Sequence, residues 1–205
     1  MAGKVKIRVV SDWSIAATAV LAALCIAISL FGFTQYAVLR SAMQDYIACE
    51  DAVQELQEGS DNLTRQVRLA AATGEQSYID AYFEEANVTR TREKALEDLS
   101  ALEGSADAIA ALQNALAASD DLMQMEYYAM RLVEESSGTD PAAWPEELQA
   151  VTLSAEDAAL SAKEKLSRAQ CMVIGLDYEK AKAVINEDVR AAVDTLSQTI
   201  CNRQN

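Results

Sequence analysis

The longest apolar segment of the chain runs over residues 13–39 and contains no charged residue. A helix needs about 20 apolar residues to cross a hydrocarbon core of roughly 30 Å, so this segment is long enough to span a membrane. Arg40 is the one basic residue that follows closely. Three basic residues precede the segment, namely Lys4, Lys6 and Arg8. Under the positive-inside rule we expect residues 1–12 in the cytoplasm and residues 40–205 outside.

A cleaved signal peptide is the competing interpretation of this segment. The apolar core of a signal peptide is about 7–15 residues long, which is much shorter than residues 13–39. Cys25 would suit a lipoprotein signal, but Leu24 stands where such a signal carries a small residue. The sequence therefore favours an uncleaved single-pass anchor in the lipid bilayer of the cell membrane.

A heptad pattern begins inside the apolar segment and continues beyond it. Apolar positions at alternating spacings of three and four indicate a helix that packs at the shallow angle of helical bundles. We expect one continuous helix to run from the membrane to about Ala72, where Thr73 and Gly74 provide a stop. The positions of the pattern are Leu39, Ala42, Tyr46, Cys49, Val53, Leu56, Ser60, Leu63, Val67 and Ala70.

Further helical segments follow, separated by glycine and serine. The loop at 136–147 holds both prolines, and we expect its Trp144 to pack onto the helices. Gly175 interrupts the last region, either as a kink or as a full turn. Antiparallel helices with short connections bury their apolar faces against each other. The expected fold is all-α: a transmembrane helix that continues into an antiparallel up-and-down four-helix-bundle-like domain. The expected helices cover 76–102, 106–135, 154–174 and 177–202.

The composition narrows the range of functions. The chain has a net charge of −15, and an acidic domain is a poor nucleic-acid binder because phosphate neutralisation requires clustered Lys and Arg. Histidine is absent, which excludes histidine general bases and histidine-containing zinc sites. We find no glycine-rich phosphate loop and no metal-ligand spacing. We therefore expect neither enzymatic activity nor a cofactor.

Cysteine usage allows one intramolecular disulfide outside the membrane. Cys25 lies in the apolar segment, and Cys49, Cys171 and Cys201 lie beyond it. Cys49 and Cys201 both fall near the membrane-proximal end of the expected domain, so they could pair, although Cys201 is one position off the apolar face of its helix.

The polar middle of the first helical hairpin is the candidate ligand-binding region. If the turn centres on Gly74, the two helices pair so that Arg65 lies near Glu84 and Arg68 near Asp80. These contacts are most simply ion pairs. Polar residues buried in this hairpin could fix the register of its two helices. They could also line a small pocket in which arginine binds a carboxylate. The candidate residues are Ser60, Asn62, Asn87, Arg90 and Arg92.

The stretch from Gly59 to Leu99 resembles the first hairpin of helical extracytoplasmic sensor domains. Such domains occur in bacterial methyl-accepting chemotaxis receptors and in membrane-bound diguanylate cyclases. The later segments MEYYAMRLVEES, LSAEDAALSAKEK and IGLDYEKAKAVI resemble the following helices of the same modules, so the resemblance covers most of residues 40–203. Its most specific residues are Ser60, Asp61, Leu63, Thr64, Val67, Arg68, Thr73, Gly74 and Tyr78.

The resemblance implies an extracytoplasmic sensor module that transmits a signal across the membrane. Receptors of this kind continue into a second membrane helix and an output domain, whereas this sequence stops at Asn205. We therefore expect either a truncated receptor or a stand-alone sensor that acts through a partner chain. By analogy it forms a homodimer and binds an unknown small ligand. The alternative is a structural or adaptor bundle that binds another membrane protein.

Overall fold

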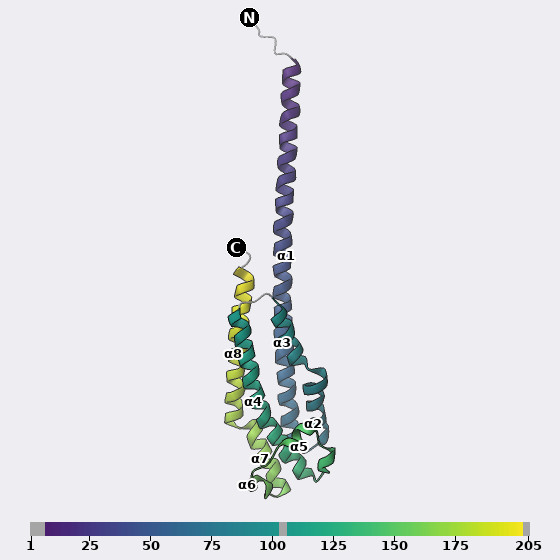
Figure 1. Ribbon diagram of the computed structural model, residues 1–205, viewed down its shortest axis with the longest axis vertical. Coiled ribbons are helices and arrows are strands. Elements are labelled where there is room, and N and C mark those ends of the chain that lie inside the picture. Colours follow the sequence, from purple (N-terminus) through teal and green to yellow (C-terminus); the bar gives the residue numbers. More distant parts are fainter. Residues whose placement is uncertain (1–6, 103–105, 203–205) are drawn as a thin grey trace.

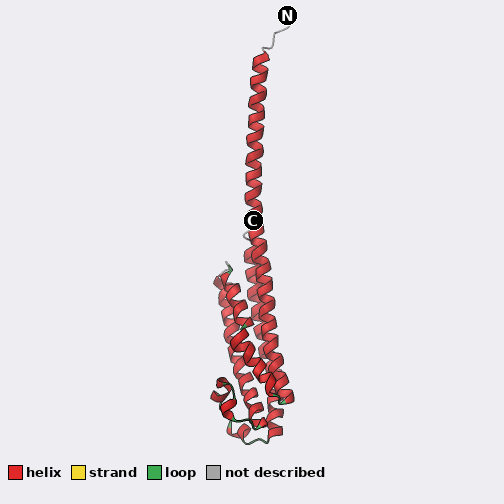
Figure 2. Ribbon diagram, turned by 90° about the vertical axis from the view of Figure 1, so that its right-hand side faces the viewer, coloured by secondary structure: helices red, strands yellow, loops and turns green. Residues whose placement is uncertain are grey.

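The computed structural model describes the backbone of residues 7–102 and 106–202, and the side chains of 13–37, 39–41, 43–102 and 110–199. The described residues are almost entirely helical and contain no strand, which confirms the all-α prediction (Figure 2). The apolar segment forms part of the helix α1, Ile7–Thr73, which is uninterrupted over 67 residues. The window that could cross a membrane has a mean hydropathy of 2.4 and no buried residue.

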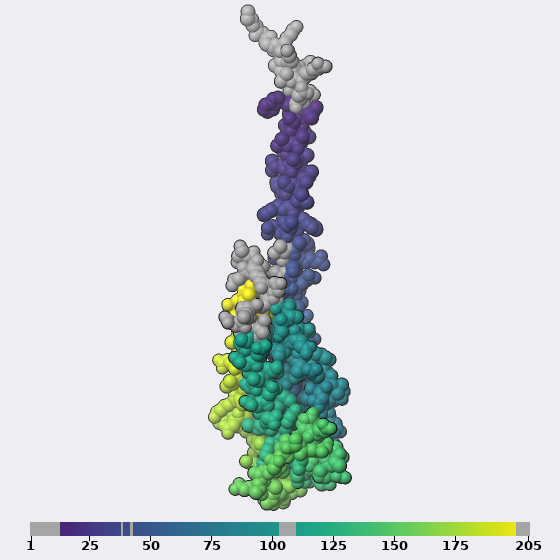
Figure 3. All heavy atoms as spheres, in the orientation of Figure 1, coloured from purple at the N-terminus to yellow at the C-terminus, as the bar shows by residue number. Residues whose placement is uncertain are grey.

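The helix α1 has two parts with different surroundings. Its upper part stands alone as a slender shaft, and its lower part is packed among the other helices (Figure 3). The expected apolar pattern is confirmed from Cys49 downward, because five of its positions are at most 7% exposed. These positions are Cys49, Leu56, Leu63, Val67 and Ala70.

The chain returns along α1 after a turn at Gly74, which has φ +74 and ends α1. Three segments make this return: α2, Gln76–Phe83; the π-helical segment η1, Glu84–Thr89; and α3, Thr91–Ala101. The prediction of one helix over 76–102 is wrong in the middle. Arg90 adopts the left-handed conformation with φ 52, and the Thr91 N–H donates to Glu85 Oε1 at 3.1 Å. The side chain of Glu85 thus accepts from the first N–H group of α3.

The helix α4, Ala106–Ser137, then descends, and the chain comes back through α7, Ala162–Ile174, and α8, Leu176–Asn202 (Figure 1). Between them lie η2, Pro141–Ala143, α5, Glu146–Ala150, and α6, Ala155–Ala158. The prediction of one helix over 154–174 is wrong, because the chain leaves the helical conformation between α6 and α7. Ser161 and Glu164 form a capping box that begins α7. Trp144 packs down as expected, at 5% exposed.

Gly175 is a kink and not a full turn. Gln170 of α7 donates to the Ala71 carbonyl, whereas Lys182 of α8 contacts Asp61 and Thr64. The two helices therefore follow α1 in one direction, one after the other, and α8 ends beside the upper part of the packed region (Figure 1).

The core consists of apolar clusters at successive levels. One lies at the membrane-distal end around Val67, Ile79 and Val133, and another at the proximal end around Cys49, Leu99 and Leu196. A small third cluster contains Leu122 and Tyr178. Buried polar side chains occupy the levels between the distal and proximal clusters, and they form the candidate site.

Candidate functional site

Glu126 of α4 is the centre of the buried polar side chains. It is 3% exposed and accepts hydrogen bonds from the hydroxyls of Tyr82, at 2.6 Å, and of Tyr178. Tyr82 comes from α2 and Tyr178 from α8, and both are fully buried. One carboxylate thus ties together three different helices.

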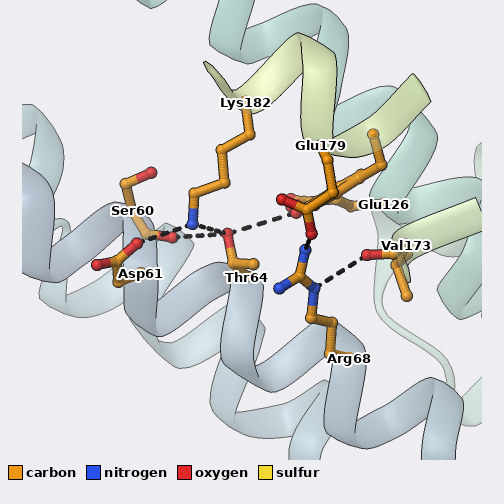
Figure 4. Close-up of polar contacts among 9 residues, drawn as sticks. Ser60, Asp61, Thr64, Arg68, Glu126, Val173, Glu179 and Lys182 are labelled. Carbon is orange, nitrogen blue, oxygen red and sulfur yellow. Dashed lines mark hydrogen bonds and ion pairs between the residues drawn. The ribbon is translucent and has the colours of Figure 1, made fainter. Parts of the chain in front are cut away.

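The fourth helix, α1, joins through Thr64. The hydroxyl of Tyr178 lies 3.4 Å from Thr64 Oγ1, and Lys182 Nζ donates to the same oxygen at 2.9 Å. Lys182 also pairs with Asp61 at 2.8 Å (Figure 4). We call Thr64, Tyr82, Glu126, Tyr178 and Lys182 the polar layer.

Burial and neighbouring charges shift the pKa values of the carboxylate and the two phenols in the polar layer. Burial raises the pKa of Glu126, although the hydrogen bonds from Tyr178 and Tyr82 and the nearby charges of Arg92 and Lys182 oppose that shift. Burial, followed by the charge of Glu126, raises the pKa values of Tyr82 and Tyr178. Both phenols therefore remain protonated and donate to Glu126 at neutral pH.

A second interhelical contact lies one turn farther along α1. Arg68 forms an ion pair with Glu179 and donates to the Val173 carbonyl at 2.9 Å (Figure 4). It therefore fixes the junction of α7 and α8 to α1. The expected pair with Asp80 is wrong, and so is the pair of Arg65 with Glu84, because Arg65 donates to Asn62 instead.

A cavity of about 40 Å³ lies among α1, α3, α4 and α8, on the membrane-proximal side of the polar layer. Most of its wall is apolar, with leucines from three helices. Its polar wall contains Ser60, Arg92 and Ser119. Arg92 is 6% exposed and donates to Ser119 Oγ at 2.6 Å, to Glu93 and to Met123 Sδ. A buried cation therefore borders an apolar space.

The structure brings together two of the five residues that the sequence suggested. Ser60 and Arg92 border the cavity. Asn62 lines a separate open hollow of about 410 Å³ between α1 and α3 and contacts Glu85. Asn87 donates to Glu147 at 2.8 Å, and Arg90 is exposed at the left-handed break before α3.

Sequence reasoning missed Glu126 and Ser119, although the sequence carries a signal for both. Counting back from Val133 in steps of four and three gives an unbroken series of buried positions on α4. A polar residue in such a series marks a buried polar site. The series is Leu112, Ala115, Ser119, Leu122, Glu126, Ala129 and Val133.

The cysteines contribute no disulfide among the described side chains. Cys49 is a buried free thiol whose Sγ lies 4.0 Å from Ser197 Oγ, and burial raises its pKa. Because Cys49 is free, the structure does not form the expected Cys49–Cys201 disulfide; the side chain of Cys201 lies outside the described residues. Cys171 is free and exposed on α7.

No family model, curated protein or solved structure matches the chain. Across the residues that the structure describes, no group of three acidic or cysteine side chains is placed to hold a metal ion. The site is thus characterised by its own geometry: a polar layer that joins four helices, beside a cavity bordered by a buried arginine.

Proposed function

We propose that the chain is a membrane-anchored extracytoplasmic sensor module of a bacterial signal-transduction protein, without catalytic activity of its own. One observation carries the proposal: α1 runs as a single helix of 67 residues from the apolar span into the packed core. Thr64 of this helix is tied to Tyr178 and Lys182 of α8. A displacement of α1 against α8 would therefore be transmitted along a rigid helix into the bilayer.

The proposal includes an up-and-down four-helix bundle as the sensing fold and an N-terminus on the cytoplasmic side. It also includes a homodimer, as in the receptors that the sequence resembles. A change in the bundle would act on an output domain, either in the same protein or in a partner chain.

A thermal-shift screen tests sensing directly. The full chain is reconstituted in nanodiscs and heated with amino acids, small carboxylates or aromatic compounds. A ligand that binds the folded state alone raises the melting temperature by mass action. A saturable increase with one compound class supports the proposal, and no increase with any compound contradicts it.

Cys171 provides a test of orientation, because it is exposed on α7 while Cys49 is buried. We expect a membrane-impermeant maleimide to label Cys171 on intact spheroplasts in a Cys201→Ser background. The matched control is the same chain with Cys171→Ser added. If Cys171 is labelled only after the spheroplasts are lysed, the domain lies on the cytoplasmic side and the proposed orientation is wrong.

An adaptor function is the second candidate, and two side chains favour it. Leu176 and Val184 of α8 are 68% and 55% exposed. They are eight residues apart, slightly more than two turns, and both lie on the exposed side of the helix. In an adaptor, the double substitution Leu176→Glu and Val184→Glu would abolish co-purification of a specific membrane protein. In a sensor that uses another surface, it would leave co-purification and ligand shifts unchanged.

A further inference from the structure

The cavity beside the polar layer has the chemistry of a small-anion site. Its polar wall includes Ser60 of α1, Arg92 of α3 and Ser119 of α4. These residues come from three helices and meet at one place, and Arg92 and Ser119 are at most 8% exposed. Donors held in place by a packed core recognise a ligand without a large loss of side-chain entropy.

A count of hydrogen bonds shows which groups remain available. Arg92 has five N–H groups, of which Nε and one Nη2 donor bind Glu93, the second Nη2 donor binds Met123, and one Nη1 donor binds Ser119. One Nη1 donor is left. Ser119 accepts from Arg92, so its own proton can still be donated. The Ser60 hydroxyl forms no hydrogen bond among the described residues.

The available groups are thus donors beside a positive charge, and this pattern selects an anion. Glu93 compensates the charge of Arg92 in part, but its side chain is 24% exposed, so water screens that pair. An anion within the cavity would be screened less because the cavity wall is mainly apolar.

The size of the cavity limits the ligand. A buried water requires about 10–15 Å³ of such space, so a cavity of about 40 Å³ holds only a few heavy atoms. The apolar part of the wall includes Leu112 and Val189, which suit a methyl or ethyl group. Gln57 and Asn186 border the cavity and are exposed, so the route from solvent passes between α1 and α8.

We infer that this cavity binds a short-chain monocarboxylate of two or three carbons, with its carboxylate at Ser60, Arg92 and Ser119. The inference rests on the proposed sensor function and specifies the ligand class of that sensor. Binding would join α1, α3 and α4 through one carboxylate next to the contact between Thr64 and α8.

The test measures melting temperature and calorimetric affinity of the full chain in nanodiscs with sodium acetate and sodium propionate. Acetamide is the neutral probe of the same shape, and sodium chloride at equal ionic strength controls for salt. We expect saturable binding of acetate or propionate and at least tenfold weaker binding of acetamide, because a charged carboxylate forms stronger hydrogen bonds with these donors than a neutral amide does.

Two substitutions localise the binding. Ser60→Ala removes a hydroxyl that has no hydrogen-bond partner among the described residues, so it should keep the unliganded melting temperature and weaken carboxylate binding by roughly tenfold. Ala115→Leu fills the cavity and should abolish binding, whereas Ala117→Leu places the same bulk on the exposed face of α4 and should not. Circular dichroism checks that each variant is folded.

Equal shifts with acetate and acetamide, unchanged affinity in Ser60→Ala, or no binding of either acid would overturn the inference. Each of these results can occur while the protein still binds another compound class from the wider screen. In that case the sensor function is supported and the proposed ligand class is refuted. If no compound in either set binds, both proposals fail.

Discussion

Glu134 of α4 is a buried carboxylate without a hydrogen-bond partner among the described residues, and its replacement should stabilise the protein. The side chain is 0% exposed, and both carboxylate oxygens are unpaired there. Gln76 lies close by, but its amide donates to Asp80. Burial raises the pKa of Glu134, and Asp80 adds to this effect, while Gln76 and Arg131 oppose it. Methionine has a similar shape and no polar atom that requires a hydrogen bond.

The magnitude follows from the two unpaired oxygens. An unsatisfied buried polar group costs about 1–3 kcal/mol. We therefore expect Glu134→Met to raise the free energy of unfolding at pH 7 by about 1–3 kcal/mol. For a chain of this size, that corresponds to an increase of roughly 2–12 °C in melting temperature.

The pH dependence provides an independent check of the same reasoning. Glu134 has a raised pKa in the folded state, so it keeps its proton to higher pH than it does in the unfolded chain. Its stabilising contribution is complete below the ordinary value of 4.5 and is lost as pH rises through the folded pKa. The melting temperature of the wild-type protein should therefore be higher at pH 5 than at pH 7. The increase should be smaller in Glu134→Met, in which Glu126 still contributes because its pKa is also raised.

The neighbouring Glu135 serves as the matched control because its pKa shifts the other way. Burial opposes the shift, but the hydrogen bonds from Lys165 and Arg131 lower the pKa of Glu135. Its contribution is present above pH 4.5 and is lost on acidification, so Glu135→Met should destabilise the protein at pH 7. Urea titration of the full chain in detergent micelles, followed by circular dichroism at several pH values, measures all three proteins. A destabilised Glu134→Met, or an unchanged pH slope, would refute the reasoning.

Three further substitutions can be measured by the same urea titration. Gly59→Ala would place a Cβ 3.0 Å from the backbone nitrogen of Arg92 and 3.3 Å from the Arg92 Cβ. It should therefore push α1 away from α3 and lower the free energy of unfolding by about 1–2 kcal/mol; an unchanged urea midpoint would contradict this contact. Arg90→Gly should stabilise by about 1 kcal/mol because the left-handed conformation at φ 52 strains arginine, and Arg90→Ala should give no such gain. Tyr178→Phe leaves Glu126 with Tyr82 as its one tyrosine donor and should cost about 1.5–3 kcal/mol; a neutral result would mean that the polar layer does not stabilise the bundle.

The helices and the apolar span were predictable from the sequence because their signals are local. The spacing of apolar residues predicted the buried positions of α1 from Cys49 to Ala70. Gly74, Gly175 and the two prolines marked the interruptions, because backbone preference at these residues depends little on distant contacts. The break at Arg90 was not predictable in this way, since it depends on Glu85 and on the close approach of Gly59 to α3.

The candidate site was predicted only in part, for a reason that Arg68 makes clear. A register inferred for one hairpin placed Arg68 near Asp80, but the side chain points to the other neighbour of α1 and pairs with Glu179. In the same way, Glu126 meets partners that lie 44 and 52 residues away in sequence. The sequence by itself determined most of the helical segments and which face of α1 is buried, because these follow from local spacing. Only the tertiary structure decided which polar groups meet, because that depends on the rotation and axial position of each helix against all its neighbours.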